Sequence, residues 1–380
     1  MLRATRPATS RCRSSADIVK AAVFHGARDV RIENVPEPDA RGQDDVVIEV
    51  IRAAICGTDA SEWDHGPLLC KPGVVLGHEF VGRVVARGDG VTRVQVGDRV
   101  VSGAGISCGH CPWCRGGRTN LCVEYRTLGL QVDGGLAEYV RSPASICHLV
   151  PDACTDDGAA MAQPLAVALH ALSRVQLMAE DHVAVIGVGG IGSLVVAGAS
   201  RRANGGRVVA IDIDHERLAT ASALGATDTA AAAEDESLRE LLLEWSGGTG
   251  FDVVIEASGA AHAPAAALAG PRRGGRVLLV GLHSAPRELD LSDTILREID
   301  VFTSVAHVCS TDIPAALHLL TENDLAASTM ARTIPLDALV EEGLRPIAER
   351  RAPGKILVTP NTTSPEANLP APLDIGARIS

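Results

Sequence analysis

The 380-residue sequence has few aromatic residues and no surplus of basic ones. Phe, Trp and Tyr make up 2% of the chain, which argues against a surface that stacks nucleic-acid bases. The formal net charge is −12, whereas nucleic acids and anionic membranes both require a basic surface. No apolar run approaches the roughly 20 residues of a membrane-spanning helix. We therefore expect a cytoplasmic globular protein with a small-molecule partner, and neither nucleic acid nor membrane.

Ten cysteines are present, but the chain lacks the other features of a disulfide-stapled secreted domain. It is long enough for about two domains, it has no secretory signal, and four of its cysteines are spaced like metal ligands. Apart from that group and Cys56, we interpret the cysteines as ordinary free thiols: Cys12, Cys70, Cys147, Cys154 and Cys309.

The four clustered cysteines lie in the segment CGHCPWCRGGRTNLC. Two two-residue gaps followed by a longer one allow four thiolates to surround one Zn²⁺ as a tetrahedron. Because such a site has no open coordination position, it would be structural rather than catalytic. The predicted ligands are Cys108, Cys111, Cys114 and Cys122.

The two ends of the chain differ in composition from the rest. Residues 1–19 are rich in Arg and Ser and contain a single acidic residue, Asp17, as organellar transit peptides do. We favour instead a disordered extension or a start placed too early. Residues 359–380 are rich in Pro, Asn, Thr and Ala, and we expect a loose tail there.

Two patterns divide the remaining chain. Short β segments dominate residues 20–165, including two apolar-alternating runs around Asp89 and Gly90 that indicate a hairpin. In residues 166–305, strands alternate with helices, which indicates a parallel sheet with helices on both faces. Residues 306–358 are too few for a core of their own, so we expect them to fold back onto the first domain.

A glycine-rich segment, GVGGIG, separates a strand from a helix in the second domain. A G-x-G-x-x-G pattern in this context binds the pyrophosphate of a dinucleotide. Gly187 permits the tight turn, Gly189 lets the backbone approach the phosphates, and Gly192 allows close packing of the helix. Gly190 and Ile191 complete the loop, and the helix N-terminus offers unpaired N–H groups to the phosphates.

An acidic residue ends the next strand. Asp212 follows Gly192 by 20 residues, and a carboxylate there can accept hydrogen bonds from both ribose hydroxyls and repel a 2′-phosphate. The sequence therefore predicts NAD rather than NADP. Asp214 is the alternative ribose partner, and Arg217 is either an adenosine contact or a solvated charge on the following helix.

A thiol and an imidazole upstream suggest a second metal site. Cys56 follows an apolar strand in ICGTD, and His78 and Glu79 follow a second apolar segment, GVVLG. A thiolate and an imidazole brought together by two strands are reasonable ligands for a catalytic zinc. This pair alone is a weak signal, but the cysteine cluster and the glycine-rich loop strengthen it.

Together these motifs resemble the zinc-containing medium-chain alcohol and polyol dehydrogenases, most closely the sorbitol, butanediol and threonine dehydrogenase branch. The resemblance covers about residues 20–358 and implies an α/β fold. A GroES-like β domain would comprise residues 20–165 and 306–358, with a zinc lobe at 105–125, and a Rossmann domain would comprise residues 166–305. The resemblance also implies one structural and one catalytic Zn²⁺ per chain, NAD as cofactor, and a homotetramer or homodimer.

The resemblance also assigns roles to individual residues near the catalytic zinc. Cys56 and His78 match zinc ligands, and Glu79 matches a residue that ligates zinc or lies just behind it. Thr58 matches the hydroxyl that takes the substrate proton, and Asp59 matches the carboxylate that orients the zinc-bound histidine.

On the cofactor side, the backbone around Val280 and Leu282 matches the strand end that holds the nicotinamide amide. His307 lies where the chain leaves the Rossmann domain. It either contacts a substrate hydroxyl or packs in the core.

Two positions depart from the family pattern. Gln163 stands where Glu, or Cys in the alcohol branch, is usual; its amide oxygen can ligate zinc but adds no negative charge. Zinc would then keep about one net positive charge unless Glu79 joins its ligands. Ser61 stands where a proton-relay histidine is frequent, and serine cannot hold a proton near neutral pH. His65, four residues further on, is the candidate substitute.

The predicted reaction is reversible oxidation of a secondary alcohol (a polyol, vicinal diol, sugar or amino alcohol) to a ketone, with hydride transfer to NAD. One alternative is a zinc-independent NADPH reductase of the same family, against which Cys56, His78, Glu79 and Asp212 argue. The other is a non-catalytic dinucleotide-binding structural or sensor protein, in which Gln163 would mark a decayed site.

Overall fold

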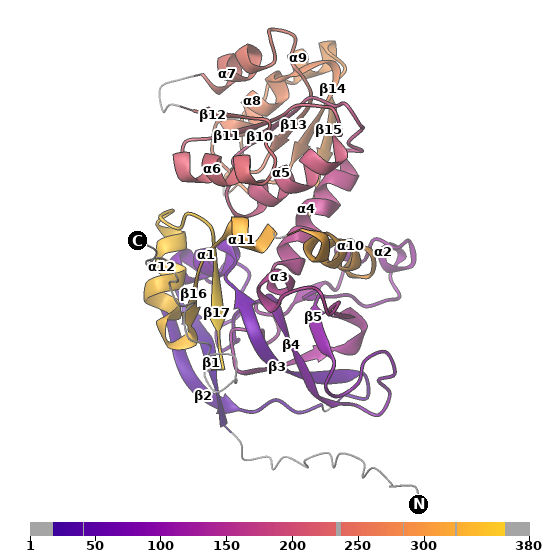
Figure 1. The fold of residues 1–380 in the computed structure, drawn as a ribbon, viewed down its shortest axis with the longest axis vertical. Helices are drawn as coiled ribbons and strands as arrows, with labels where there is room; N and C mark the ends of the chain where they lie inside the picture. Colours follow the sequence, from indigo (N-terminus) through magenta and orange to yellow (C-terminus); the bar gives the residue numbers. More distant parts are fainter. Residues whose placement is uncertain (1–17, 41, 233–236, 284, 324, 362–380) are drawn as a thin grey trace, which may run out of the picture.

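The computed structural model describes residues 18–40, 42–232, 237–283, 285–323 and 325–361, and it is elongated, with two sheet-based halves stacked along its length (Figure 1). Residues 1–17 and 362–380, which hold most of the predicted extension and tail, lie outside this range. The first strand begins at Ile18 and Asn361 is buried, so ordered structure reaches slightly beyond both predicted limits. Among the described residues, no helix is long and apolar enough to cross a membrane.

The upper half of Figure 1 is a six-stranded parallel sheet in the order β12-β11-β10-β13-β14-β15. This arrangement confirms the predicted α/β class. The strands are β10 (Val183–Ile186), β11 (Val208–Asp212), β12 (Asp228–Ala231), β13 (Phe251–Glu256), β14 (Pro271–Leu279) and β15 (Asp300–Thr303). The helices around them are α5 (Gly190–Arg202), α6 (His215–Ala223), α7 (Leu238–Trp245), α8 (Ala263–Ala269) and α9 (Leu291–Leu296).

Both faces of this sheet are buried, which explains the continuous apolar runs of its strands. In β10, Val183 and Val185 belong to one core with α4 (Ala162–Arg174), α5 and α10 (Cys309–Glu322). Ala184 and Ile186 alternate with them and belong to a second core with α7 and α8. Side chains therefore alternate between two helical layers, as the pleat of a strand requires.

The lower half is built on a seven-stranded sheet in the order β16-β17-β3-β4-β5-β9, with β8 also paired to β3. The last two strands of the chain join this sheet, because β17 pairs antiparallel with β3. The sheet strands are β3 (Asp45–Ala54), β4 (Glu79–Arg87), β5 (Arg99–Ser102), β8 (Tyr139–Pro143), β9 (Cys147–Leu149), β16 (Met330–Pro335) and β17 (Lys355–Thr359).

Smaller elements surround this sheet. The outer strand pairs are β1 (Ile18–Gly26) with β2 (Asp29–Pro36), and β6 (Gly105–Ile106) with β7 (Arg126–Thr127). The helices are α1 (Gly57–His65), α2 (Pro112–Arg115), α3 (Asp156–Ala160), α11 (Leu325–Thr329) and α12 (Arg345–Ala348), and the short helical turns are η1 (Thr119–Leu121), η2 (Ala144–Ile146), η3 (Leu336–Ala338) and η4 (Leu339–Leu344).

The hairpin predicted around Asp89 and Gly90 takes a different form. β4 and β5 do pair antiparallel, but β4 ends at Arg87 and β5 begins only at Arg99. The second alternating run is a loop whose Val91 and Val94 are buried in the core. Val96, which alternates with Val94 in the sequence, is 60% exposed, so this run does not bury one face as a strand would.

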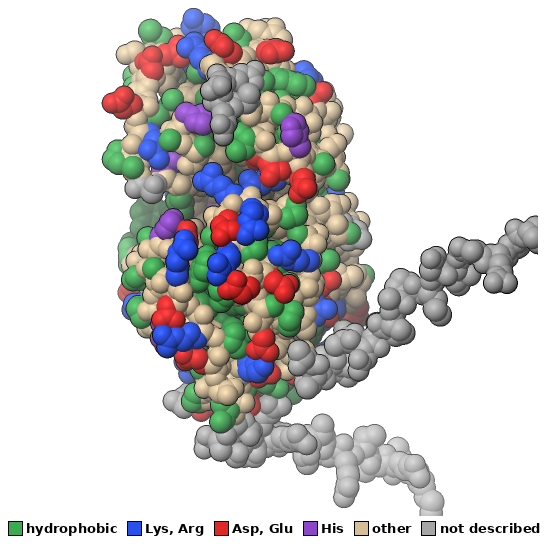
Figure 2. Space-filling view, turned by 90° about the vertical axis from the view of Figure 1, so that its left-hand side faces the viewer, with side chains coloured by type: hydrophobic (Ala, Val, Ile, Leu, Met, Phe, Trp, Pro, Cys, Tyr) green, Lys and Arg blue, Asp and Glu red, His purple; other side chains and the backbone are tan. Residues whose placement is uncertain are grey.

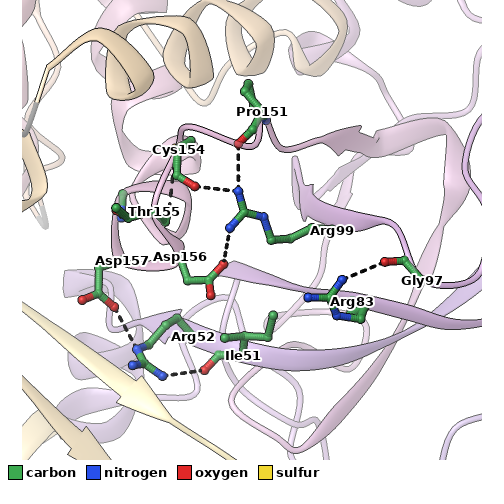
Figure 3. Close-up of polar contacts among 11 residues, drawn as sticks. Ile51, Arg52, Arg83, Gly97, Arg99, Pro151, Cys154, Thr155, Asp156 and Asp157 are labelled. Atoms are coloured by element: carbon green, nitrogen blue, oxygen red, sulfur yellow. Dashed lines mark hydrogen bonds and ion pairs between the residues drawn. The ribbon is translucent and has the colours of Figure 1, made fainter. Parts of the chain in front are cut away.

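Two arginines fasten the segment that leads from the lower half into the upper one (Figure 3). Arg52 of β3 donates to Asp157 at 2.8 Å, and Arg99 of β5 donates to Asp156 at 3.1 Å and to two backbone carbonyls nearby. Both carboxylates lie in the first turn of α3. The sheet of the lower half therefore holds the start of the α3–α4 segment, which crosses between the halves.

Charges of both signs are mixed across the middle of the face shown in Figure 2. The helical C-terminal region also carries ion pairs of Arg345 with Glu341 and of Arg351 with Glu349. This face carries interleaved charges rather than one continuous basic area.

Candidate active site

Three potential metal ligands meet where α1 and β4 begin. Cys56 is the N-cap residue of α1, Glu79 is the first residue of β4, and His78 directly precedes it. The Cys56 Sγ, a His78 ring nitrogen and a Glu79 carboxylate oxygen all lie within 4.8 Å of one another. The antiparallel pairing of β3 with β4 places Ala54 opposite Glu79, which brings the chain just after β3 to the start of β4.

Several polar atoms of this cluster are buried without a hydrogen-bond partner among the described residues: Glu79 Oε1, His78 Nδ1 and Asp59 Oδ1. Asp59 Oδ1 lies 3.7 Å from His78 Nδ1, and Asp59 Oδ2 accepts the Cys56 N–H at 2.9 Å. Unpaired buried polar atoms are costly, and a thiolate, an imidazole and a carboxylate are the donors that zinc prefers. The residues present therefore fit a zinc ion, with Asp59 placed to orient the His78 ring.

Negative charge dominates the surroundings of His78. Burial opposes a charged imidazole, but the nearby Cys56 and Asp59 outweigh it and raise the pKa of His78 to about 10. Burial in turn raises the pKa of Asp59, against the attraction of His78. A pocket that holds a proton this firmly is electrostatically suited to a cation, and a divalent metal can replace that proton.

Lys355, which sequence reasoning missed, completes the cluster. It is the first residue of β17, its side chain is 8% exposed, and its Nζ forms an ion pair with Glu79 Oε2 and donates to the Ile55 carbonyl at 3.1 Å. Burial alone would lower the pKa of Lys355, but Glu79 and Cys56 raise it. No local motif marks this lysine, because only the pairing of β17 with β3 brings it here.

A cleft of about 280 Å³ joins this cluster to the glycine-rich loop. Its walls come from both halves of the molecule: Cys56 and Thr58 from the lower one, and Gly189 and Gly190 from the upper one. A Cβ atom on Gly189 or Gly190 would meet almost nothing, so their backbone is bare toward an incoming ligand. The cleft is further lined by Ile191, Ser193, Arg217, Thr220, Thr329 and Lys355.

Steric demands explain the other two glycines of the motif. Gly187 has φ +81°, and a Cβ there would lie 2.4 Å from the Ser258 Cβ. A Cβ on Gly192 would lie 1.8 Å from the Gly187 carbonyl oxygen. Only glycine fits at either position, and the resulting turn leads directly into α5. The loop therefore fits a dinucleotide pyrophosphate at the N-terminus of that helix.

The structure separates the two candidate ribose partners. Asp212 ends β11 and is buried; its Oδ2 accepts the Val188 N–H at 2.8 Å and its Oδ1 accepts the Asp214 N–H at 3.1 Å. Arg217 Nη1 lies 3.9 Å from Asp212 Oδ1. Asp214 is instead the N-cap of α6 and accepts the N–H groups of Glu216 and Arg217. Only Asp212 is therefore held against the glycine-rich loop.

Four other predicted site residues do not line this cleft. Ser61 is exposed on α1, and His65 is 72% exposed and lies 3.5 Å from Asp64. The Val280 N–H donates to the Glu256 carbonyl at 2.8 Å, and Leu282 is 85% exposed. The roles that we assigned to these residues remain predictions.

The structure places three further candidates as follows. Thr58 Oγ1 lies 3.6 Å from the Cys56 Sγ. Gln163 is half-buried near the start of α4, and α4 contacts β4. His307 is 1% exposed, neither of its ring nitrogens has a hydrogen-bond partner among the described residues, and burial lowers its pKa to about 4.

The four cysteines predicted to bind a structural zinc form a second cluster in the cysteine lobe (residues 105–125). Their sulfur atoms all lie within 4.8 Å of one another. The N–H of Cys108 donates to the Cys122 Sγ at 3.2 Å, and the N–H of Cys111 donates to the Cys108 Sγ at 3.4 Å. Backbone N–H groups lower the pKa of Cys111 and of Cys122, which favours the thiolate form that binds zinc. The lobe therefore fits a structural zinc with four sulfur ligands.

Comparison with known proteins supports the same assignment. The model of the alcohol dehydrogenase GroES-like domain matches residues 42–152, and that of the zinc-binding dehydrogenase matches residues 190–322. Sorbitol dehydrogenase from Bacillus subtilis is 34% identical over 290 residues, which are 75% of this chain and 81% of that protein. L-threonine 3-dehydrogenase from Yersinia enterocolitica is 37% identical over 267 residues, 70% of this chain and 77% of that protein.

Among solved structures, 2R,3R-butanediol dehydrogenase from Bacillus subtilis superposes with a TM-score of 0.82 at 32% identity, covering 90% of this chain and 100% of that one. The glycine-rich loop shares one cleft with Cys56 of the Cys–His–carboxylate cluster, an arrangement that suits a zinc-dependent dehydrogenase. The chain belongs to the zinc-containing medium-chain alcohol dehydrogenase family.

Proposed function

We propose that this protein is an NAD-dependent dehydrogenase that oxidises a secondary alcohol of the polyol, vicinal diol, sugar or amino alcohol class to a ketone. The observation that carries the proposal is the shared cleft, which Cys56 and Thr58 line from one side and Gly189 and Gly190 from the other. Relatives named sorbitol, L-threonine and 2R,3R-butanediol dehydrogenase support a substrate with two neighbouring heteroatoms.

The proposed catalytic zinc would be held by Cys56, His78 and Gln163, with Glu79 Oε1 available as a further ligand. Bound there, zinc would lower the pKa of the substrate hydroxyl and polarise the product carbonyl. Thr58 would accept the hydroxyl proton.

From Thr58 the proton would pass outward along α1. Thr58, Ser61 and His65 are spaced three and four residues apart, so they follow one face of this helix. Ser61 and His65 are exposed, so a proton delivered to them reaches solvent. His65, as an imidazole, would hold the proton before its release.

The upper half would hold the dinucleotide. We propose that residues 166–305 form the Rossmann domain and that the Asp212 carboxylate accepts hydrogen bonds from the adenosine ribose and repels a 2′-phosphate. NAD would supply the hydride acceptor, and closure of the cleft would exclude water from the reacting atoms. The homotetramer or homodimer expected from the resemblance is part of this proposal.

Metal content and a substrate screen test the proposal together. Elemental analysis of protein purified without added metal should give about two zinc ions per chain, and NAD⁺ should be reduced in the presence of a diol, polyol or sugar. Cys56→Ala should remove one zinc and the activity, whereas Cys70→Ala, a buried thiol outside both clusters, should remove neither. One zinc per chain that does not change when zinc is supplied would overturn the metal-assisted mechanism.

A further inference from the structure

A buried amide connects the cysteine lobe to the segment that carries His307. Asn120 belongs to η1 within this lobe and is 7% exposed. Its Nδ2 donates to the Val305 carbonyl at 3.0 Å and lies 3.2 Å from His170 Nε2. One side chain of the lobe therefore touches both α4 and the linker between β15 and α10, which lie together where the two halves meet (Figure 1).

The same linker is held from its other end through His170. Because the amide nitrogen of Asn120 can only donate, His170 Nε2 must accept, which leaves the ring proton on Nδ1. His170 Nδ1 lies 2.9 Å from Asp312 Oδ2, and that carboxylate oxygen also accepts the Val308 N–H at 2.7 Å. These polar contacts thus lead from the Val305 carbonyl, through the side chains of Asn120, His170 and Asp312, to the Val308 N–H.

Between these two anchored residues the backbone is strained. Ala306 has φ +49°, a left-handed conformation that is unfavourable for alanine and persists only where its surroundings enforce it. The next residue is His307, which is buried and whose two ring nitrogens have no hydrogen-bond partner in the part of the chain that the structure describes. A neutral imidazole in this state can donate to one hydroxyl group and accept from another.

The segment that follows His307 packs beside the strands that lead to the candidate metal cluster. Its Cys309 contacts Gly103, just after β5, and β5 pairs with β4, which begins at Glu79. His78 is also among the groups that influence the protonation of His307, together with Asp312, His170 and His148. On the other side of the linker, the Cys309 Sγ donates to the Gly103 carbonyl at 3.4 Å, so α10 is also fastened to the lower half.

We infer that Asn120 is a positioning residue for His307. Through it, the cysteine lobe holds residues 305–308 in the strained conformation that keeps the His307 ring beside the active site. The inference rests on the proposed function in one respect, namely that His307 contacts a hydroxyl of the substrate. By this inference the structural zinc also affects residues 305–308, because a cysteine lobe that unfolds would lose the hydrogen bond from Asn120 to the Val305 carbonyl.

Asn120→Asp tests the contact with an almost isosteric side chain. The variant loses both N–H donors and places a negative oxygen against the Val305 carbonyl and His170 Nε2. Hydrogen exchange read by mass spectrometry should become about tenfold faster at the Ser304 and Val308 amides, with zinc content unchanged. Asn204→Asp, the same change at an exposed position, is the matched control and should leave these amides unaffected.

A kinetic readout separates positioning from a general loss of stability. Asn120→Asp should raise the KM for the alcohol about tenfold and leave the KM for the dinucleotide unchanged. If the aspartate variant does not fold, Asn120→Ser removes the same donors without adding charge and should give the same two results. Unchanged exchange at Ser304 and Val308 would overturn the inference. A wild-type protein that oxidises no alcohol would instead refute the proposed function, and the exchange result would still decide the role of Asn120.

Discussion

Lys355 and Glu79 form a buried ion pair across 276 residues of sequence, inside the candidate catalytic centre. The lysine takes one carboxylate oxygen, Oε2, and leaves Oε1 buried without a partner among the described residues. The Glu79 carboxylate is thereby held in one orientation, with its free oxygen available to a metal. The lysine also offsets one of the negative charges that Cys56, Asp59 and Glu79 bring to this pocket.

Removing one partner of this pair should strongly destabilise the protein, because the other buried charge would be left unpaired. Lys355→Met is expected to lower the free energy of unfolding of the zinc-free protein by about 3–5 kcal/mol, measured by urea denaturation. Adding Glu79→Gln to this variant should recover much of the loss, since no charge is then left unpaired. Lys20→Met removes a lysine from an exposed pair with Asp337 and should change stability little. An equally small effect at Lys355 would contradict the buried pairing.

The choice of coenzyme should depend on one of two neighbouring aspartates. Asp212→Ala is expected to raise the KM for NAD⁺ about tenfold or more and to improve the use of NADP⁺, since the 2′-phosphate is no longer repelled. Asp214→Ala removes the N-cap of α6 and should cost about 1 kcal/mol of stability while leaving the ratio of the two coenzymes unchanged. Steady-state kinetics with both coenzymes and thermal unfolding distinguish the two variants. A change of coenzyme preference in Asp214→Ala alone would reverse the assignment.

Sequence motifs predicted the parts of the site that are local. Cys108 to Cys122 and Gly187 to Gly192 are short segments whose own spacing carries the signal, so they could be read without knowing the fold. The α/β class was predictable for a related reason, because each buried strand is a short apolar run.

Contacts made by the fold could not be predicted in this way. Lys355 reaches Glu79 only because the last strand pairs with β3, and Asn120 reaches Val305 only because the lobe packs beside α4 and α10. Neither residue stands in a pattern that distinguishes it from an ordinary surface residue. The loop valines Val91 and Val94 show the opposite failure, since an apolar pattern that we attributed to a strand belongs to a loop packed on the core.

The neutral side chain at position 163 should weaken metal retention. Gln163→Glu adds a negative charge beside the proposed zinc, so we expect the second zinc to dissociate about ten times more slowly into a chelator. Gln176→Glu makes the same change at an exposed position just beyond the end of α4 and is the control. Zinc release followed with a colorimetric chelator gives the two rates. Equal rates in Gln163→Glu and wild type would mean that residue 163 does not approach the metal.

Acid should destabilise the protein through His307. Its pKa is about 4 in the folded state because of burial, below the ordinary value of 6.5 that the unfolded chain would show. Between these values the unfolded chain binds a proton that the folded one does not. The stability that the neutral His307 contributes is therefore complete above pH 6.5 and is lost as the pH falls toward 4. Over this range the free energy of unfolding should change by up to about 1.4 kcal/mol per pH unit.

Urea unfolding at pH 7, 6 and 5 measures this slope. In His307→Gln, the free energy of unfolding should fall less steeply below pH 6.5, by the contribution of one titrating group. Part of the decrease that remains should come from His148, because burial also lowers its pKa to about 4. His318→Gln, at an exposed position on α10, is the control and should keep the wild-type slope. If His307→Gln also keeps that slope, then His307 is protonated equally in both states. That result would contradict the burial of a ring that is 1% exposed and has no hydrogen-bond partner within the described ranges.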